Sequence, residues 1–331
     1  MADNEFRDKI ILVTGGTGSI GSVLVSKLLE FDPKQIRIYS RNDSRQYRLL
    51  ERFNHDPRIR ILSGDVRDFD RLDLAMQDVD IVYHAAALKH VPICEYNPFE
   101  AVQTNIIGSQ NVIRAAAKHR VKKVIGISTD KVANASNVLG ITKLMMEKLF
   151  INSNFYNAGT IFSCVRFGNV AWAEGSVLPV WKKQAAEKGR ILVTDSKMTR
   201  FLMSLDQAAD LVFKATNLMK GGEIFVFKMA GIKLTDLAKV FVNKYFPGKN
   251  ISIQLAGIRA GEKIHEQLVG HGDENSQIFE DKDMLIIFPA INTGYRFPSE
   301  KRNYPNFRGV VRKINYSSDK YINKSKITKI I

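Results

Sequence analysis

The feature that most constrains the fold is a glycine-rich turn that directly follows the first apolar run of the chain. Lys9–Thr14 (KIILVT) is expected to form a buried strand, and apolar residues recur at helical spacing over Ser22–Phe31. Glycines at 15, 18 and 21 permit a tight turn, close approach of backbone N–H groups to a pyrophosphate, and close helix–strand packing. The pattern predicts a dinucleotide site at the end of this strand, contacted by Gly15, Thr17, Gly18, Ser19 and Ile20.

Short apolar runs alternate with helical patterns through the first half of the chain, which is typical of βα units and a parallel sheet. Further strands are expected at Gln35–Ser40, Ile59–Ser63, Asp80–His84, Lys123–Ser128 and Ile161–Phe167, and helices at Pro98–His119, Lys143–Ile151 and Leu178–Lys188. We expect an α/β fold: a Rossmann-type doubly wound parallel sheet with a smaller C-terminal α/β substrate-binding region. The expected division is a dinucleotide-binding domain (1–170), a mainly substrate-binding region with segments returning to the first domain (171–290), and a basic C-terminal tail (291–331).

The charge of the chain favours an anionic small molecule as its ligand. The net charge is +15, and residues 301–331 supply +8 of it, because nine Lys or Arg face the single acidic residue Asp319. We expect this tail to be a solvated terminal segment and the mildly basic remainder to suit a phosphorylated substrate. The chain has no basic motif interleaved with aromatic residues, so no nucleic-acid partner is expected.

The cysteine content and the hydropathy pattern indicate a cytoplasmic protein. Cys94 and Cys164 are too few for a disulfide scaffold and are expected to be buried thiols. No apolar run approaches the roughly 18 residues that cross a bilayer, so no membrane insertion is expected. The histidines show no metal-ligand spacing, so no metal site is expected, and His84 is expected to be a packed residue at a strand end.

The end of the second predicted strand bears on which dinucleotide is bound. An acidic residue at this point normally contacts the ribose 2′-hydroxyl of NAD, whereas this chain has Ser40 and Arg41. Both side chains can hold a 2′-phosphate, which favours NADP, while Asp43 leaves NAD as the alternative. The other expected cofactor contacts follow the third and fourth strands: Asp65 and Val66 at the adenine, and Ala85 and Ala86 where the dinucleotide passes close to the backbone.

A series of short motifs runs in order along the chain. They are GDVRD (64–68), HAAALKHVP (84–92), EYNP (95–98), STDK (128–131), RFGNV (166–170), MTRF (198–201), GEIFV (222–226) and GEKIHE (261–266). Together with the glycine-rich turn, they resemble the motifs of UDP-N-acetylglucosamine 4,6-dehydratases, extended short-chain dehydrogenases/reductases of bacterial surface-sugar synthesis. The resemblance covers about residues 8–290.

The resemblance implies a redox-neutral hydro-lyase. Such an enzyme oxidises C4 of UDP-N-acetylglucosamine, eliminates water across C5–C6 and returns the hydride to C6, so a tightly bound NADP is regenerated in each turnover. By the resemblance, Asp130 is the acid for the C6 hydroxyl, Lys131 the base at C5, and Thr129 a hydrogen-bond partner of the C4 oxygen. Lys143 is expected at the nicotinamide ribose. The implied product is a UDP-4-keto-6-deoxy-N-acetylhexosamine.

The resemblance also implies the contacts to the UDP-sugar. Arginines suit a diphosphate because they bind it through two parallel hydrogen bonds. The implied substrate-binding residues are Arg200 and Arg259 at the diphosphate, Glu262 at a ribose hydroxyl, Lys89 near the sugar, and Asn169, Val177 and Thr199. Because relatives assemble into rings, a homo-oligomer, namely a hexamer, is expected.

Three positions depart from the family pattern. Leu139 stands where short-chain dehydrogenases usually have the tyrosine of Tyr-x-x-x-Lys, and leucine cannot accept the C4 hydroxyl proton. Ala135 stands where relatives usually have proline, and Glu174 brings a carboxylate near the expected diphosphate. The first deprotonation is therefore left to Lys131, Asp130 or a water molecule.

These departures leave more than one outcome open. The turn GSIGS and Leu139 favour relatives that retain the C5 configuration, whereas the middle of the chain and GEKIHE favour inverting ones, so retention is expected with inversion as the alternative. Release of a 5,6-ene product is a second alternative. A catalytically silent binder of nucleotide sugars is the third.

Overall fold

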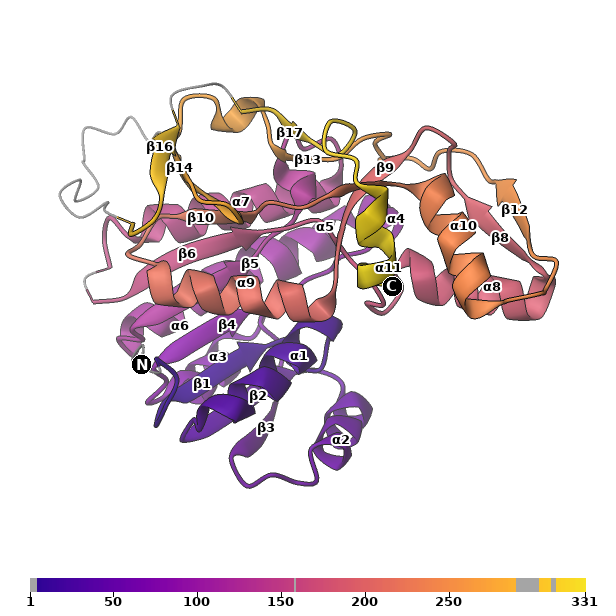
Figure 1. Ribbon diagram of the computed structural model, residues 1–331. Helices are drawn as coiled ribbons and strands as arrows, with labels where there is room; N and C mark the ends of the chain where they lie inside the picture. The colour runs from indigo at the N-terminus through magenta and orange to yellow at the C-terminus, as the bar shows by residue number, and fades with distance from the viewer. Residues whose placement is uncertain (1–4, 158, 290–303, 311–313) are drawn as a thin grey trace.

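The computed structural model describes residues 5–157, 159–289, 304–310 and 314–331, and its centre is a large mixed sheet (Figure 1). Within those ranges the sheet has ten strands in the order β16-β14-β15-β10-β6-β5-β4-β1-β2-β3. The strands from β10 to β3 run parallel, and β15, β14 and β16 extend the sheet antiparallel. Their bounds are β1 Ile10–Thr14, β2 Gln35–Ser40, β3 Ile59–Ser63, β4 Ile81–His84, β5 Lys123–Ile127, β6 Ile161–Arg166, β10 Ile224–Phe227, β14 Gln277–Glu280, β15 Met284–Phe288 and β16 Arg308–Val310.

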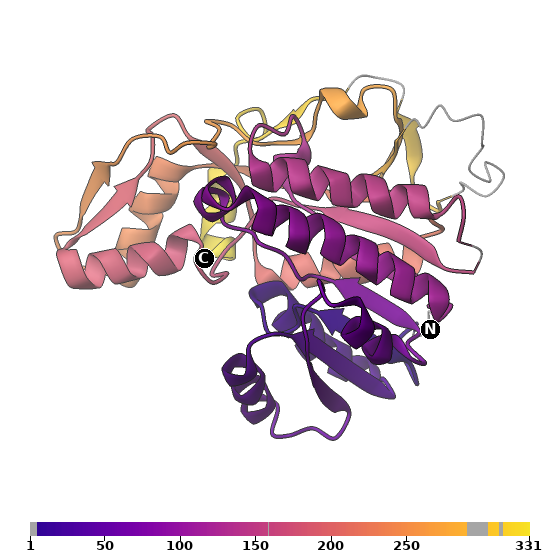
Figure 2. The same cartoon turned by 180° about the vertical axis from the view of Figure 1, so that it is seen from behind.

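Helices cover both faces of the sheet, as expected for a doubly wound Rossmann fold. Figure 1 shows α1 (Ser19–Leu28) and α9 (Leu205–Leu218) on the near face, and Figure 2 shows the helices on the opposite face. That second layer contains α3 (Phe69–Met76), α6 (Gly108–Lys118) and α7 (Val138–Ser153), which contact one another in sequence order. Strands buried on both faces have nearly continuous apolar sequences, and the predicted fold class is confirmed.

Two predicted helices differ in their details from the structure. The segment Pro98–His119 consists of α5 (Pro98–Ala101), a π-helix (Val102–Ile107) and α6. In the π-helix, the Asn105 side chain accepts a hydrogen bond from the Leu88 N–H and donates one to the Leu88 carbonyl, and the wider turns accommodate this contact. The helix expected from Lys143 begins earlier, since the Asn137 side chain accepts a hydrogen bond from Gly140 and caps it. Two further helices, α2 (Asp43–Arg52) and α4 (Val91–Tyr96), follow β2 and β4.

A second region with its own core lies beside the large sheet, on the right of Figure 1. Trp181, Leu237 and Phe241 are buried in this core. Within the described ranges, no helix of either region is both long and apolar enough to cross a membrane. The elements of the second region are β7 Asn169–Val170, α8 Val177–Lys188, β8 Arg190–Val193, β9 Thr199–Met203, β11 Gly231–Lys233, α10 Leu234–Tyr245 and β12 Ser252–Leu255.

The expectation of a solvated C-terminal tail is wrong for parts of the described segments 304–310 and 314–331, although residues 319–326 are exposed. β16 extends the large sheet, and β17 (Tyr316–Ser317) pairs with β13 (Gln267–Val269). The last helix, α11 (Ile327–Ile330), packs into the second core. Apolar residues between the basic ones supply this packing, which the net charge does not reveal. The rest of the predicted tail, 291–303 and 311–313, lies outside the described residues.

A buried ion cluster joins three parts of the chain beneath the carboxyl ends of the parallel strands. Arg166 at the end of β6 contacts Glu147 of α7 at 2.8 Å and Asp273, just after β13, at 2.8 Å. Burial alone lowers the pKa of Arg166, but the two carboxylates outweigh it and raise that pKa. Glu147 also accepts a hydrogen bond from Ser128, the residue before Thr129. The cluster therefore fixes β6, α7 and β13 around the end of β5.

We predict that Arg166→Met destabilises the protein by about 3–5 kcal/mol, because two buried carboxylates lose their shared counter-ion. Urea denaturation followed by circular dichroism measures this change. The control is Arg308→Met, which breaks an ion pair with Glu280 at an arginine whose side chain is 82% exposed, and it should cost less than about 1 kcal/mol. An equal decrease in the free energy of unfolding for both variants would contradict the view that the buried cluster stabilises the protein more than an exposed ion pair does.

Candidate functional site at the carboxyl edge of the sheet

The sequence-predicted cofactor and catalytic residues gather at one edge of the large sheet. The turns after β1, β2, β4 and β5 all emerge at the carboxyl ends of parallel strands, which is where open α/β sheets bind their ligands. The turn after β5 enters a 3₁₀ helix, Asp130–Val132. The structure thus brings together segments that are far apart in the sequence.

The turn after β1 has the form expected of a dinucleotide-binding loop. Gly15 has a φ of +67°, and a Cβ at this position would lie 2.7 Å from the backbone nitrogen of Ala86. The loop after β4 is therefore in backbone contact with the glycine-rich turn. Gly18 precedes the first residue of α1, so the helix N-terminus opens at the loop.

The segment of Glu174 reaches this loop from the second region. The backbone N–H of Glu174 donates to Ser19 Oγ (2.9 Å), and its carbonyl accepts from Lys89 Nζ (2.7 Å). Its carboxylate contacts Arg45 of α2 at 2.7 Å. The carboxylate that the sequence places near the diphosphate is therefore paired with an arginine in this structure.

The end of β2 is lined by cations, and the nearby carboxylates have partners. The Arg41 side chain is 56% exposed and lies 3.5 Å from Asp65, whose carboxylate is also held by Arg67 at 2.7 Å. Asp43 Oδ1 accepts a hydrogen bond from the N–H of Ser44, inside the first turn of α2. The carboxylate of Asp43 thus serves its own helix terminus.

Thr129, Asp130 and Lys131 form a compact buried cluster at the end of β5. Lys131 Nζ lies 3.0 Å from Asp130 Oδ1, and the Thr129 hydroxyl donates to the same oxygen at 2.9 Å. Asp130 is completely buried, and Gly140 lets α7 pack close by, since a Cβ there would lie 2.4 Å from the Lys131 carbonyl oxygen. A fourth group completes the cluster: Glu266 Oε1 is 3.5 Å from Lys131 Nζ.

In this cluster, neighbouring charges shift the pKa of each group in the opposite direction to burial. Burial raises the pKa of the Asp130 carboxyl, although Lys131 partly offsets the change. For Lys131, burial lowers the pKa, but Asp130 and Glu266 outweigh it, so the pKa is raised. For Glu266, Lys131, Arg200 and Lys263 outweigh burial and lower the pKa. A carboxyl with a raised pKa within hydrogen-bond distance of an amine is the kind of pair that acid–base catalysis uses.

Leu139 and Lys143 lie one turn apart on α7 in different surroundings. Leu139 packs against Val91, Cys94 and Ala101, so position 139 is apolar. Lys143 is buried, and burial lowers its pKa to about 8; its Nζ contacts Met146 Sδ at 3.0 Å. Within the described residues, the Lys143 ammonium donates to a thioether, which is a weak acceptor. Its position therefore suits a ligand with hydroxyl oxygens, such as a nicotinamide ribose.

The predicted substrate residues are placed unequally. Thr199 is buried, and its hydroxyl contacts His265 Nδ1 (2.8 Å) and Ser318 Oγ (2.7 Å). Arg200 donates to two backbone carbonyls and lies 3.8 Å from Glu266. The Arg259 side chain is 63% exposed, and Glu262 lies 3.9 Å from it. Asn169 lies in β7, and Val177 is the first residue of α8.

Several buried polar atoms around these residues lack partners among the described residues. Buried oxygens normally have hydrogen bonds, so a group of orphaned ones suggests a missing ligand. The atoms concerned are Asp130 Oδ2, Asn169 Oδ1, Ser176 Oγ, Glu262 Oε2 and Glu266 Oε2.

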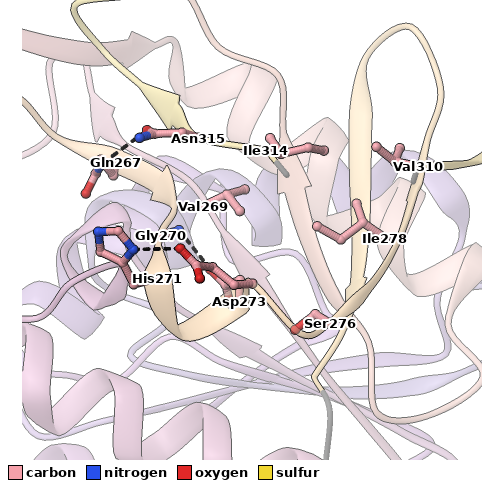
Figure 3. Close-up of a pocket in the computed structure, with 11 residues that line it drawn as sticks. Gln267, Val269, Gly270, His271, Asp273, Ser276, Ile278, Val310, Ile314 and Asn315 are labelled. Carbon is pink, nitrogen blue, oxygen red and sulfur yellow. Dashed lines mark hydrogen bonds and ion pairs between the residues drawn. The ribbon is translucent and has the colours of Figure 1, made fainter. Parts of the chain in front are cut away.

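A separate cavity of about 250 Å³ lies beside β13 (Figure 3). Its lining includes Gln267, Val269, His271, Ile278 and Asn315, and none of the sequence-predicted site residues.

Sequence reasoning missed three groups of this site. Glu266 lies in the GEKIHE motif without an assigned role, Ser318 belongs to the segment expected to be solvated, and Lys263 donates to the carbonyls of Ala133 and Asn134. The motif was a usable signal for Glu266 and Lys263. Nothing in the local sequence marks Ser318.

The sequence of this chain is similar to those of known proteins along most of its length. A family model described as polysaccharide biosynthesis protein matches residues 11–287. The "uncharacterized membrane protein MJ1061" of Methanocaldococcus jannaschii is 46% identical over 99% of this chain and 96% of its own. A Campylobacter jejuni protein named UDP-N-acetylglucosamine 4,6-dehydratase (inverting) is 45% identical over 86% of this chain and 84% of its own. Rickettsia proteins named UDP-glucose 4-epimerase are 41–44% identical over 80–81% of this chain and 78–80% of theirs.

Solved structures show the same architecture. Pen from Bacillus thuringiensis is 41% identical, with a TM-score of 0.90 over 99% of this chain and 98% of that chain. A dTDP-glucose 4,6-dehydratase from Streptomyces venezuelae with NAD bound shares the fold, at 20% identity and a TM-score of 0.68 over 77% of this chain and 86% of that chain. The chain therefore belongs to the polysaccharide biosynthesis protein family, among the extended short-chain dehydrogenases/reductases related to UDP-N-acetylglucosamine 4,6-dehydratases.

Proposed function

We propose that the protein is a UDP-N-acetylglucosamine 4,6-dehydratase, a hydro-lyase that forms a UDP-4-keto-6-deoxy-N-acetylhexosamine for surface-glycan synthesis. The observation that carries the proposal is the buried Asp130–Lys131 pair, with 3.0 Å between Nζ and Oδ1. Removal of water from neighbouring carbons needs an acid and a base side by side. The 45% identity to a protein named for this reaction supports the same substrate.

The two side chains divide the elimination between them. Asp130, whose pKa is raised by burial, keeps a proton and donates it to the departing C6 hydroxyl. Lys131, whose pKa is raised by Asp130 and Glu266, removes the C5 proton after it has passed its own proton to Asp130. We assign the Thr129 hydroxyl, which donates to Asp130, to the C4 oxygen.

A dinucleotide fits the glycine-rich loop and the buried ammonium of Lys143. When bound, it takes up the hydrogen and electron pair of C4 and returns them to C6, so it is regenerated in each turnover. The pyrophosphate is assigned to Gly15 and the segment 17–20, the nicotinamide ribose to Lys143, and the rest of the molecule to Asp65, Val66, Ala85 and Ala86. Ser40 and Arg41 favour NADP over NAD, because Asp43 is held by its own helix.

The UDP group is assigned to the second region. Arg200 and Arg259 supply positive charge for the diphosphate, Glu262 accepts from a ribose hydroxyl, and the remaining contacts are Asn169 and Val177. Two further residues contact the substrate only after exchanging partners. Lys89 leaves the Glu174 carbonyl, and Thr199 leaves His265 or Ser318.

A 4-epimerase is the second candidate, because several relatives have that name. Epimerisation also begins with oxidation at C4, but it needs no acid for C6 and no base at C5. The buried Asp130–Lys131 pair therefore favours the dehydratase. A released 5,6-ene and a silent binder are the remaining alternatives.

We also propose a cytoplasmic homo-oligomer, with a hexamer as the expected state. Both cysteines are buried free thiols, as is usual in a reducing compartment. Large apolar side chains are exposed on helices of one side of the chain, and a second copy would bury them. They are Ile93 and Tyr96 of α4, Phe99 of α5, and Ile141 and Met145 of α7.

We predict that the purified protein converts UDP-N-acetylglucosamine in D₂O into a 4-keto-6-deoxy sugar with deuterium at C5. The deuterium enters because the base at C5 exchanges its proton with solvent before it is returned. Proton NMR without added cofactor measures both changes and shows whether the cofactor is retained in purification. The H3–H5 nuclear Overhauser contact in H₂O separates retention from inversion. An unchanged sugar, also with NADP or NAD added, would contradict the dehydratase.

Lys131→Ala should abolish C5 exchange and elimination while UDP binding persists, because the base is lost and the diphosphate contacts are not. The same NMR experiment, with calorimetry for UDP, checks this. The matched control is Lys188→Ala at the end of α8, which should behave like the wild type. Exchange at the wild-type rate in Lys131→Ala would remove this lysine from the role of base.

Arg41→Ala should weaken NADP binding about 10-fold or more and leave NAD binding unchanged, since a charge-assisted hydrogen bond to the 2′-phosphate is lost. Calorimetric titration with both dinucleotides measures the two affinities. Arg48→Ala, on the exposed side of α2, is the control. A protein that binds NAD more tightly than NADP before any substitution would contradict the assignment.

A further inference from the structure

Glu266 is a buried carboxylate beside the catalytic pair for which the proposed reaction has no stated use. Its Oε1 lies 3.5 Å from Lys131 Nζ and 3.8 Å from Arg200 Nε. Its Oε2 is buried and has no hydrogen-bond partner among the described residues. Lys131, Arg200 and Lys263 compensate the charge of this carboxylate, but its unpartnered oxygen beside the proposed base points to a chemical role.

The backbone of Glu266 is fixed independently of its carboxylate. Its N–H donates to Ser318 Oγ (2.9 Å), and its carbonyl accepts from the Ser318 N–H (2.8 Å). Ser318 Oγ also contacts Thr199 Oγ1 at 2.7 Å. The C-terminal segment therefore holds Glu266 in place against Lys131.

The proposed reaction releases a proton that position 139 cannot hold. Oxidation of C4 frees the proton of its hydroxyl before Asp130 gives its own proton to the C6 oxygen, so a group of the enzyme or a water molecule has to hold one proton in between. Leu139 has no atom that accepts it and lies in an apolar cluster. Lys131 cannot keep it either, because the C5 proton comes next.

Resting on the function proposed above, we propose that Glu266 stores the C4 hydroxyl proton, which it receives and returns through Lys131. Glu266 acts through the lysine and does not touch the substrate, so it is a positioning residue for this proton. Lys131 suits the transfer because its Nζ lies 3.0 Å from Asp130 and 3.5 Å from Glu266.

The proton balance closes with one proton shared by the three groups. At the start Glu266 is ionised, and the Asp130–Lys131 pair holds one proton, which passes from the Lys131 ammonium to Asp130 along their hydrogen bond and leaves the amine neutral for the reaction. The C4 O–H bond breaks, and its proton passes to Lys131 and then to Glu266, which leaves the lysine neutral again. Lys131 next takes the C5 proton while Asp130 gives its proton to the C6 oxygen, which departs as water, and Lys131 returns a proton to C5. Finally Glu266 passes its proton through Lys131 to Asp130.

The charges around Lys131 allow this storage to respond to substrate. The groups that face it are Asp130 on its own segment, Glu266 before β13, Arg200 on β9, and Lys263 from the GEKIHE motif. Lys131, Arg200 and Lys263 together lower the pKa of Glu266 in the free protein, despite its burial. Because Arg200 is also assigned to the diphosphate, bound UDP offsets its charge and raises the affinity of Glu266 for a proton.

The test is a single-turnover measurement of C4 oxidation with Glu266→Gln, by absorbance at 340 nm after mixing with UDP-N-acetylglucosamine and NADP. At pH 7 we expect the oxidation to slow about 10²-fold or more, the range of a lost proton acceptor. The rate of this variant should rise with pH, because hydroxide or buffer must take the proton, whereas the wild-type rate should be flat. Glu266→Asp should recover much of the rate, since a carboxylate is restored.

The matched control is Glu223→Gln, another fully buried glutamate, which accepts from Ser163 and Tyr304 at the amino-terminal end of β10. It should lower the melting temperature and leave the oxidation rate and its pH profile unchanged. The proposal is overturned if Glu266→Gln oxidises C4 at the wild-type rate, or if its loss is independent of pH and shared by Glu266→Asp. A wild-type protein that never oxidises the sugar would instead overturn the proposed function, and with it this role.

Discussion

Arg166 and its two buried carboxylates are the contact on which the rest of the site depends. The cluster ties β6 to α7 through Glu147 and to the segment after β13 through Asp273. These are the elements that flank the turn after β5, where Thr129, Asp130 and Lys131 lie. Because breaking one side of a buried pair leaves a bare charge, the cluster resists any shift of β13 away from α7. The distance from Glu266 to Lys131 depends on that position, and the Ser318 bonds then fix it from the C-terminal side.

The roles that we propose for Asp130, Lys131 and Glu266 would let a fold shared with epimerases serve elimination. Oxidation at C4 needs a dinucleotide and an acceptor for one proton, and the common Rossmann scaffold provides the loop for the first. Elimination needs in addition an acid and a base at neighbouring carbons, within a volume that excludes water. Burial and charge act in opposite directions on the pKa of each of these three groups, and Lys131 Nζ lies 3.0 Å from Asp130 and 3.5 Å from Glu266, so we propose that protons pass among them. Under this proposal, the C4 hydroxyl proton has an acceptor although Leu139 stands where related enzymes have a tyrosine.

The sequence predicted the parallel sheet well, because its central strands are buried on both faces and bounded by polar residues, as β1 and β5 show. It predicted the glycine-rich loop for the same local reason. It did not predict the π-helix at Val102–Ile107, which depends on a bond from Asn105 to a loop distant in sequence. Nor did it predict that the basic C-terminal segment packs into the second core and bonds Glu266 through Ser318. The many basic residues of this segment indicated exposure, and its few apolar residues gave no clear pattern of burial. Glu266 lay within a recognised motif, but the role that we propose for it rests on its distance to Lys131, which only the structure shows.

The measurement that tests the central claim most directly is the fate of the hydrogen on C4. UDP-N-acetylglucosamine with deuterium at C4 is incubated with the protein in H₂O, and the products are examined by deuterium NMR and mass spectrometry. The account predicts a 4-keto sugar with the label in the C6 methyl group, because the hydrogen removed from C4 returns to the carbon that lost water. A label that stays at C4, with or without inversion there, would contradict it and indicate an epimerase or a different eliminated product.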